Sequence, residues 1–179
     1  MKKVAVGVET LSMSSDFFSK NSFEKFDLPL NLNIDLEDLE QRYFKAQHHY
    51  HPDRLRTSNI SSENTITDYA AAFNEAYQIL KDPLKRADHL LKCLGWLVSD
   101  ETLGSKQDPH LLTFMMELNE KIEGAITEEE KKQLESFLEN EIHHSWQALE
   151  NSIDKQDKDM ALTCFMKLKY LHRLHLNLK

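Results

Sequence analysis

The chain has 179 residues, of which 40% are hydrophobic, so it can form one domain or two small ones. Its formal net charge of −8 at pH 7 argues against non-specific binding to nucleic acid, although a local basic face is compatible with it. With only four Gly and four Pro, the sequence does not favour a β-rich fold with many turns.

The N-terminal residues 1–21 carry Ser and Thr with scattered apolar residues and no sustained period. We expect a flexible leader or an irregularly packed segment here. Residues 1–8 begin like a signal peptide, but Glu9 interrupts the apolar region, and a transit peptide would contain more Arg and fewer acids. No apolar run approaches the roughly 20 residues that a membrane span requires. We therefore expect a cytoplasmic protein that binds neither membrane nor nucleic acid.

Two amphipathic helices are predicted next, at about residues 36–50 and 62–81. Asp35 can cap the first, with Asp38 as an acid at the third helical position. Apolar residues recur at spacings of three and four in both helices. They are Leu36, Leu39, Tyr43, Ala46 and Tyr50 in the first, and Ile66, Tyr69, Ala70, Phe73, Ala76, Tyr77 and Leu80 in the second. A short connection predicts that the two helices pack antiparallel.

The tripeptide His51-Pro52-Asp53 lies between these helices. Pro52 disfavours the α conformation at His51 and has no N–H to continue a helix, so the tripeptide should be exposed at the tip of a helical hairpin. There the carboxylate of Asp53 can meet an arginine of a partner. A hairpin tip offers neither a pocket nor an adjacent nucleophile, so we expect a binding loop and no enzymatic activity.

The C-terminal half is predicted to be helical as well. Pro83 can open a helix that Gly95 ends, and the polar residues 99–108 form a predicted linker. Three helices with short connections then imply a small antiparallel bundle, the second opened by a capping box of Thr127 and Glu130. The apolar stripe of that second helix passes through either Trp146 or Ser145. Cys93 and Cys164 lie far apart in helical patterns without a Cys-x-x-Cys motif, which predicts buried, reduced thiols.

The order of helix, His-Pro-Asp loop, longer helix and residues 81–87 (KDPLKRA) resembles a J-domain. Residues 23–29 (FEKFDLP) and 32–35 (LNID) are similar to one J-protein family, HscB, the co-chaperones of iron–sulfur cluster assembly. The resemblance covers about residues 22–179 and is strongest over 23–97. It implies an all-α protein with a leader at 1–21, a J-domain at 22–98, a linker at 99–108 and a C-terminal three-helix bundle at 109–179.

The resemblance also implies partners and site residues. An HscA/DnaK-class chaperone would be stimulated in its ATPase activity by His51, Pro52 and Asp53. The exposed basic face of the preceding helix would meet the same chaperone, and its candidate residues are Arg42, Lys45 and His49. An ordinary solvated face accounts equally well for those three side chains.

An IscU-like scaffold protein would bind to the C-terminal bundle. Laid on the family pattern, the contact residues are Leu112, Met116, Glu117, Glu120 and Tyr170. The family often has Met after the leucine, whereas Thr113 stands here, so the apolar patch could shift toward Met115 and Met116. Met115 and Met116 could also be core residues.

The histidines raise the question of a metal site. The groups to consider are His48, His49 and His51, then His143 and His144, then His172 and His175. The last pair has a usable spacing of three, but no third ligand occurs in its local pattern, so we expect no metal and no cofactor. Two alternatives to the scaffold-delivering co-chaperone stay open: a general J-protein for unfolded clients, and a helical adaptor without a chaperone link.

Overall fold

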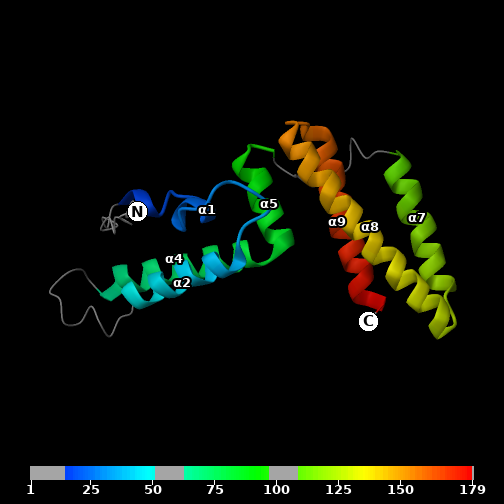
Figure 1. Cartoon of the computed structure of the whole chain (residues 1–179), viewed down its shortest axis with the longest axis horizontal. Helices are drawn as coiled ribbons and strands as arrows, with labels where there is room; N and C mark the ends of the chain where they lie inside the picture. The colour runs from blue at the N-terminus through cyan, green and yellow to red at the C-terminus, as the bar shows by residue number, and fades with distance from the viewer. Residues whose placement is uncertain (1–14, 51–62, 97–108, 179) are drawn as a thin grey trace, which may run out of the picture. The chain divides into compact units, whose positions relative to one another are not determined.

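The computed structural model describes residues 15–50, 63–96 and 109–178, and within these ranges every regular element is a helix (Figure 1). The predicted all-α class is confirmed. The elements are η1 (Ser15–Phe17), α1 (Ser22–Lys25), α2 (Leu36–His49), α4 (Glu63–Lys81), α5 (Pro83–Cys93), α7 (Pro109–Gly124), α8 (Glu128–Asp154) and α9 (Lys158–Leu178). None of these helices is long and apolar enough to cross a membrane.

The described residues belong to two compact units, residues 1–81 and residues 82–179. This division falls between α4 and α5. The J-domain limits of 22–98, the linker at 99–108 and the bundle limits of 109–179 stay a prediction.

Polar side chains determine where the helices of the first unit begin. At α1, the backbone N–H of Glu24 donates to Oδ1 of Asn21 over 3.0 Å, and the N–H of Asn21 donates to the Glu24 carboxylate over 2.9 Å. At α2, Oδ1 of Asp35 accepts from the N–H groups of Glu37 and Asp38 at 2.9 and 3.2 Å. The predicted cap at Asp35 is therefore confirmed.

An aromatic cluster forms the core of the first unit. The ring of Tyr50, at the end of α2, stacks on Tyr69 of α4 with centroids 5.1 Å apart, and Phe73 lies 5.3 Å away. Phe17 packs 4.8 Å from Tyr69 and 4.9 Å from Phe73, and only 4% of it is exposed. Burial of the Phe17 ring ties residues 15–21 to the core, which agrees with the second of the two expectations for residues 1–21, an irregularly packed segment. Residues 1–14 lie outside the described residues.

In the second unit, α5 begins and ends at predicted signals. Pro83 occupies the first turn, where its missing N–H leaves no bond unmade, and Oδ1 of Asp82 accepts from two backbone N–H groups at 2.9 and 3.0 Å. After the helix, Gly95 adopts φ 75°, and the N–H of Trp96 donates to the carbonyl of Leu91 over 2.8 Å. This left-handed glycine closes the helix, as the sequence indicates.

Helices α7, α8 and α9 share an apolar core, as expected for the C-terminal bundle. Its buried members are Leu118 of α7, Leu138 of α8, and Leu171 and Leu174 of α9. The most extensive contact between helices of this unit is that of α8 with α9.

The structure of the second unit bears on three further sequence predictions. The Thr127–Glu130 capping box at α8 is confirmed. Of the two alternatives in the stripe of α8, Ser145 is the buried residue, at 4% exposure, and Trp146 is half-buried. Cys93 and Cys164 are not joined by a disulfide; Cys164 is buried, which raises its pKa, whereas Cys93 is half-buried.

Candidate functional site

His51, Pro52 and Asp53 lie outside the described residues, but the residue before them is firmly anchored. The N–H of Tyr50 donates to the carbonyl of Ala46 over 2.9 Å and completes the last turn of α2. Only 3% of Tyr50 is exposed, and this burial raises the pKa of its phenol. The chain therefore enters the His-Pro-Asp segment from a fixed point in the aromatic core.

Arg42, one of the three predicted basic contacts on α2, is engaged within the molecule. Its Nε lies 2.8 Å from Oδ2 of Asp38. Its Nη1 donates to the backbone carbonyls of Phe26 and Asp27 at 2.9 and 3.2 Å. Asp27 has φ 52°, in a turn that these two hydrogen bonds brace. Arg42 thus joins α2 to the end of α1 through its Nε and Nη1 atoms, while Nη2 forms no hydrogen bond within the described residues.

Lys45 and His49, the other two predicted contacts, are exposed one turn apart on α2. Phe44 lies beside Lys45 with 60% of its surface exposed. The sequence did not single out Phe44, because this residue stands outside the buried stripe. An aromatic residue at a polar position of a helix was nevertheless a signal that could have identified it. Phe44 lies about 100° from Lys45 around the helix axis, so the three residues form a broad surface on α2 and not a single stripe. These three residues, Phe44, Lys45 and His49, are named the α2 face below.

The predicted scaffold-binding residues of α7 all lie on its solvent side. Leu112 is 40% exposed and Met116 is 65% exposed, and Glu117 and Glu120 are exposed beside them. Leu112, Met116 and Glu120 follow one another at spacings of four, so they line a single face of the helix. These four residues are named the α7 patch below.

Tyr170 connects α9 to α7. Its phenolic Oη donates a 2.8 Å hydrogen bond to the backbone carbonyl of Met115, the residue before Met116. The guanidinium of Arg173 lies 5.2 Å from the centre of its ring, and burial raises the pKa of the phenol. The structure therefore brings Tyr170 to the helix that carries the α7 patch, with its hydroxyl already used.

A second link between helices lies nearby. The ammonium of Lys167 on α9 is 2.7 Å from the carboxylate of Glu141 on α8 and 4.4 Å from the ring centre of Phe114 on α7. The side chain of Lys167 thus contacts both other helices of the bundle, which helps to hold α7 in a fixed orientation.

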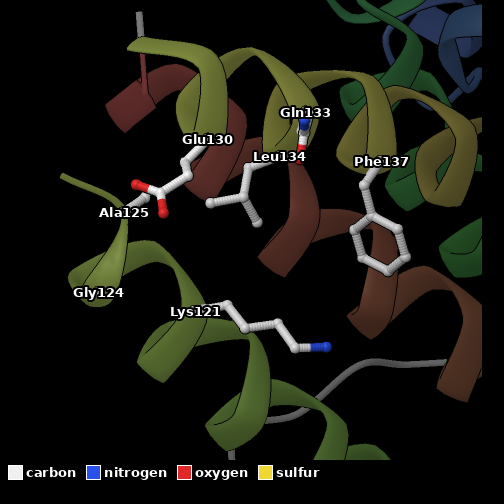
Figure 2. A pocket seen from close by; sticks show the side chains of 7 residues that line it. All are labelled: Lys121, Gly124, Ala125, Glu130, Gln133, Leu134 and Phe137. Carbon is white, nitrogen blue, oxygen red and sulfur yellow. The ribbon is translucent and has the colours of Figure 1, made fainter. Parts of the chain in front are cut away.

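An open hollow of about 420 Å³ lies between the end of α7 and the start of α8 (Figure 2). Its lining residues are Lys121, Gly124, Ala125, Glu130, Gln133, Leu134 and Phe137. No residue of the α7 patch lines it, and it holds no pairing of nucleophile and base. The hollow is therefore distinct from the predicted binding residues.

Comparison with known proteins adds independent information. Residues 107–179 match the family described as the HSCB C-terminal oligomerisation domain. A co-chaperone protein HscB homolog of Haemophilus ducreyi is 30% identical over 158 residues, which cover 87% of this chain and 91% of that protein.

Solved structures resemble the chain over most of its length. Chaperone HscB from Vibrio cholerae is 29% identical with a TM-score of 0.74, covering 89% of this chain and 95% of that one. Human co-chaperone protein HscB is 25% identical with a TM-score of 0.79, covering 89% of this chain and 81% of that one. The Jac1 co-chaperone from Saccharomyces cerevisiae, at 22% identity and a TM-score of 0.69, supports the fold alone.

Proposed function

The chain belongs to the HscB co-chaperone family, and on this basis we propose that it delivers an IscU-like scaffold protein to an HscA/DnaK-class chaperone. It stimulates the ATPase of that chaperone and thereby promotes iron–sulfur cluster assembly and transfer. ATP hydrolysis belongs to the partner, and the cytoplasm is the proposed location.

The observation that carries the scaffold assignment is the exposure of Leu112 and Met116 on α7. Removal of these apolar side chains from water on binding lowers the free energy of the complex, and an unbranched Met adapts to the shape of a partner. Glu117 and Glu120 beside them favour a partner surface with basic groups. A folded protein with a mixed apolar and basic surface fits the α7 patch better than an unfolded apolar segment does.

The chaperone assignment rests on the first unit. The α2 face offers an exposed aromatic ring, an ammonium and an imidazole next to the point where Tyr50 anchors the chain. Such a surface suits an acidic partner, and Asp53 in the following segment would pair with an arginine of the chaperone.

Scaffold binding can be tested by calorimetry with matched exposed residues as controls. We expect Leu112→Ala and Met116→Ala each to weaken binding of the IscU-like protein by roughly tenfold, as truncation of an interface hot spot does. Leu176→Ala and Met160→Ala, at residues 72% and 51% exposed on α9, should bind like the wild type. Absence of wild-type binding at tens of micromolar would remove the scaffold role and favour a general J-protein.

ATPase stimulation requires a second experiment. In single-turnover assays of the chaperone, the wild-type chain should accelerate hydrolysis, and Asp53→Asn should not. Asp68→Asn, an exposed change of the same kind on α4, serves as the control and should stimulate fully. Equal stimulation by Asp53→Asn and the wild type would contradict the role of the loop.

A further inference from the structure

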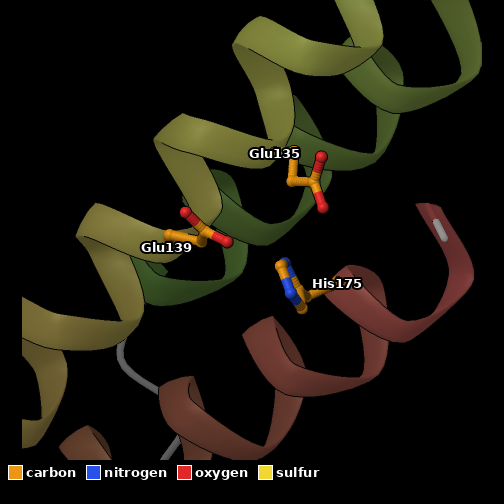
Figure 3. Close-up of side chains that lie close together, drawn as sticks. All are labelled: Glu135, Glu139 and His175. Atoms are coloured by element: carbon orange, nitrogen blue, oxygen red, sulfur yellow. The ribbon is translucent and has the colours of Figure 1, made fainter.

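Three potential metal ligands converge on one point of the C-terminal bundle. Glu135 and Glu139 project from α8, and His175 faces them from α9 (Figure 3). Each offers one oxygen or nitrogen atom, and the three atoms all lie within 4.8 Å of one another. The two glutamates are four residues apart, so they occupy the same side of α8 on successive turns.

The sequence did not reveal this group, because its members are far apart in the chain. His175 could be paired only with His172 on its own helix, and that pair lacked a third ligand. The packing of α8 along α9 supplies two carboxylates from a segment about 40 residues earlier in the chain.

The polar atoms of Glu135, Glu139 and His175 have few hydrogen-bond or ion-pair partners among the described residues. Nδ1 of His175 is buried and has no hydrogen-bond partner in the part of the chain that the structure describes. A buried polar atom without a partner raises the free energy of the folded state. Among the same residues, neither Glu135 nor Glu139 forms an ion pair, whereas Glu141 on the same helix pairs with Lys167 at 2.7 Å. A bound cation would neutralise the two carboxylates and give the imidazole an electron-pair acceptor.

We propose that Glu135, Glu139 and His175 form a binding site for a divalent transition-metal ion of the Zn²⁺ class. Zn²⁺ takes imidazole nitrogen and carboxylate oxygen at about 2.0–2.2 Å, with water completing a tetrahedral set of three protein ligands. Such bonds place the ligand atoms roughly 3.4 Å apart, so separations of at most 4.8 Å would need to shorten by no more than about 1.4 Å on binding. Glu139 is exposed and its side chain can rotate to close this gap.

The combination of one imidazole and two carboxylates determines which metal ions the site prefers. Imidazole favours Zn²⁺ and its transition-metal neighbours, whereas Ca²⁺ and Mg²⁺ prefer all-oxygen sites with more ligands. The ion would also link α8 to α9 and stabilise the folded chain by an amount that grows with the logarithm of the free ion concentration once that concentration exceeds Kd. This site does not depend on the proposed co-chaperone function.

The test is a Zn²⁺ titration of the full chain against a chromogenic chelator, with nitrogen NMR of the histidine rings. The wild type should bind one Zn²⁺ through these residues and shift the ring resonances of His175, and excess Ca²⁺ should not displace it. Glu139→Gln and His175→Gln should each weaken binding by roughly tenfold or more, since even the loss of an outer-shell partner has effects of that size.

Matched variants test whether a loss of Zn²⁺ binding is specific to the three proposed ligands. Glu123→Gln removes one exposed carboxylate of α7, and a double His143→Gln/His144→Gln variant removes exposed imidazoles of α8; both should bind Zn²⁺ as the wild type does. Because Glu139 is exposed, Glu139→Gln decides the matter even if His175→Gln misfolds. Unchanged binding by Glu139→Gln, loss of binding in the His143/His144 variant, or no Zn²⁺ bound by the wild type would each overturn the proposal.

Discussion

The phenolic Oη of Tyr170 and the backbone carbonyl of Met115 are 2.8 Å apart and join α9 to α7. The bond lies next to Met116, so the residue assigned to scaffold contact by resemblance also positions the helix that carries the α7 patch. In the proposed scaffold complex, a hydroxyl occupied in this way would act mainly through the orientation of α7, while the half-buried ring remains partly available to a partner.

Tyr170→Phe tests this division of roles. The variant keeps the ring and loses the hydrogen bond to Met115, so we expect the free energy of unfolding to fall by about 1 kcal/mol. Affinity for the scaffold should fall less in Tyr170→Phe than in Tyr170→Ala, which also removes the ring. Urea unfolding and calorimetry measure the two quantities. Equal losses of affinity in both variants would show that the hydroxyl, and not the ring, accounts for the contribution of Tyr170 to binding.

Arg42 is expected to act on the stability of the first unit, unlike the exposed residue Lys45 on the same helix. Its guanidinium donates to the carbonyls of Phe26 and Asp27, so Arg42→Ala should destabilise the first unit by about 1–3 kcal/mol through the loss of charge-assisted hydrogen bonds. Lys45→Ala, on the exposed α2 face, should leave stability unchanged and weaken stimulation of the chaperone. Thermal unfolding and the single-turnover assay distinguish the two variants. If Arg42→Ala is as stable as the wild type but fails to stimulate the chaperone, Arg42 contacts the chaperone instead.

The sequence predicted the parts of this fold that depend on local chemistry. The caps at Asp35 and Thr127 and the glycine stop at Gly95 require only the residues within one helical turn. The choice between Ser145 and Trp146 could not be made, because it depends on how α8 is rotated against α9.

Tertiary packing also decided those features of the candidate sites that the sequence left open. The family resemblance assigned Leu112 and Met116 to the partner-facing patch, while the sequence left open that Met116 is a core residue. The structure places Leu111 and Leu118 on the buried side of α7 and leaves Leu112 and Met116 exposed. The contacts of Arg42 with backbone carbonyls of the α1 turn and the approach of His175 to Glu135 arise from tertiary packing. One sequence without aligned relatives carries no record of such pairs.

The bundle core provides a prediction with a matched control. Leu138 of α8 is fully buried against Leu171 and Leu174, so Leu138→Ala removes buried apolar surface and leaves a cavity. We expect the free energy of unfolding to fall by about 2–5 kcal/mol. Leu176→Ala makes the same chemical change at a residue that is 72% exposed on α9, and it should change stability little. Similar unfolding midpoints for both variants in urea would contradict the core assignment.

The capping box of α8 predicts a dependence on pH. The carboxylate of Glu130 accepts hydrogen bonds from the backbone N–H groups of Thr127 and Ile126 at 2.9 and 3.0 Å and from the Thr127 hydroxyl at 2.9 Å. These bonds lower the pKa of Glu130 below its ordinary value of 4.5.

A carboxylate whose pKa is lowered by folding adds stability above its unfolded pKa, and this stability is lost as the pH falls through the folded pKa. Wild type should therefore exceed Glu130→Gln in unfolding free energy at pH 7, and the difference should shrink as the pH falls below about 4.5. Urea unfolding of both proteins between pH 7 and pH 3 measures this convergence. Glu129→Gln, one residue earlier without these hydrogen bonds, should show a smaller pH-dependent difference. A gap between wild type and Glu130→Gln that stays constant over this range would mean that the stabilising bonds do not require the ionised carboxylate.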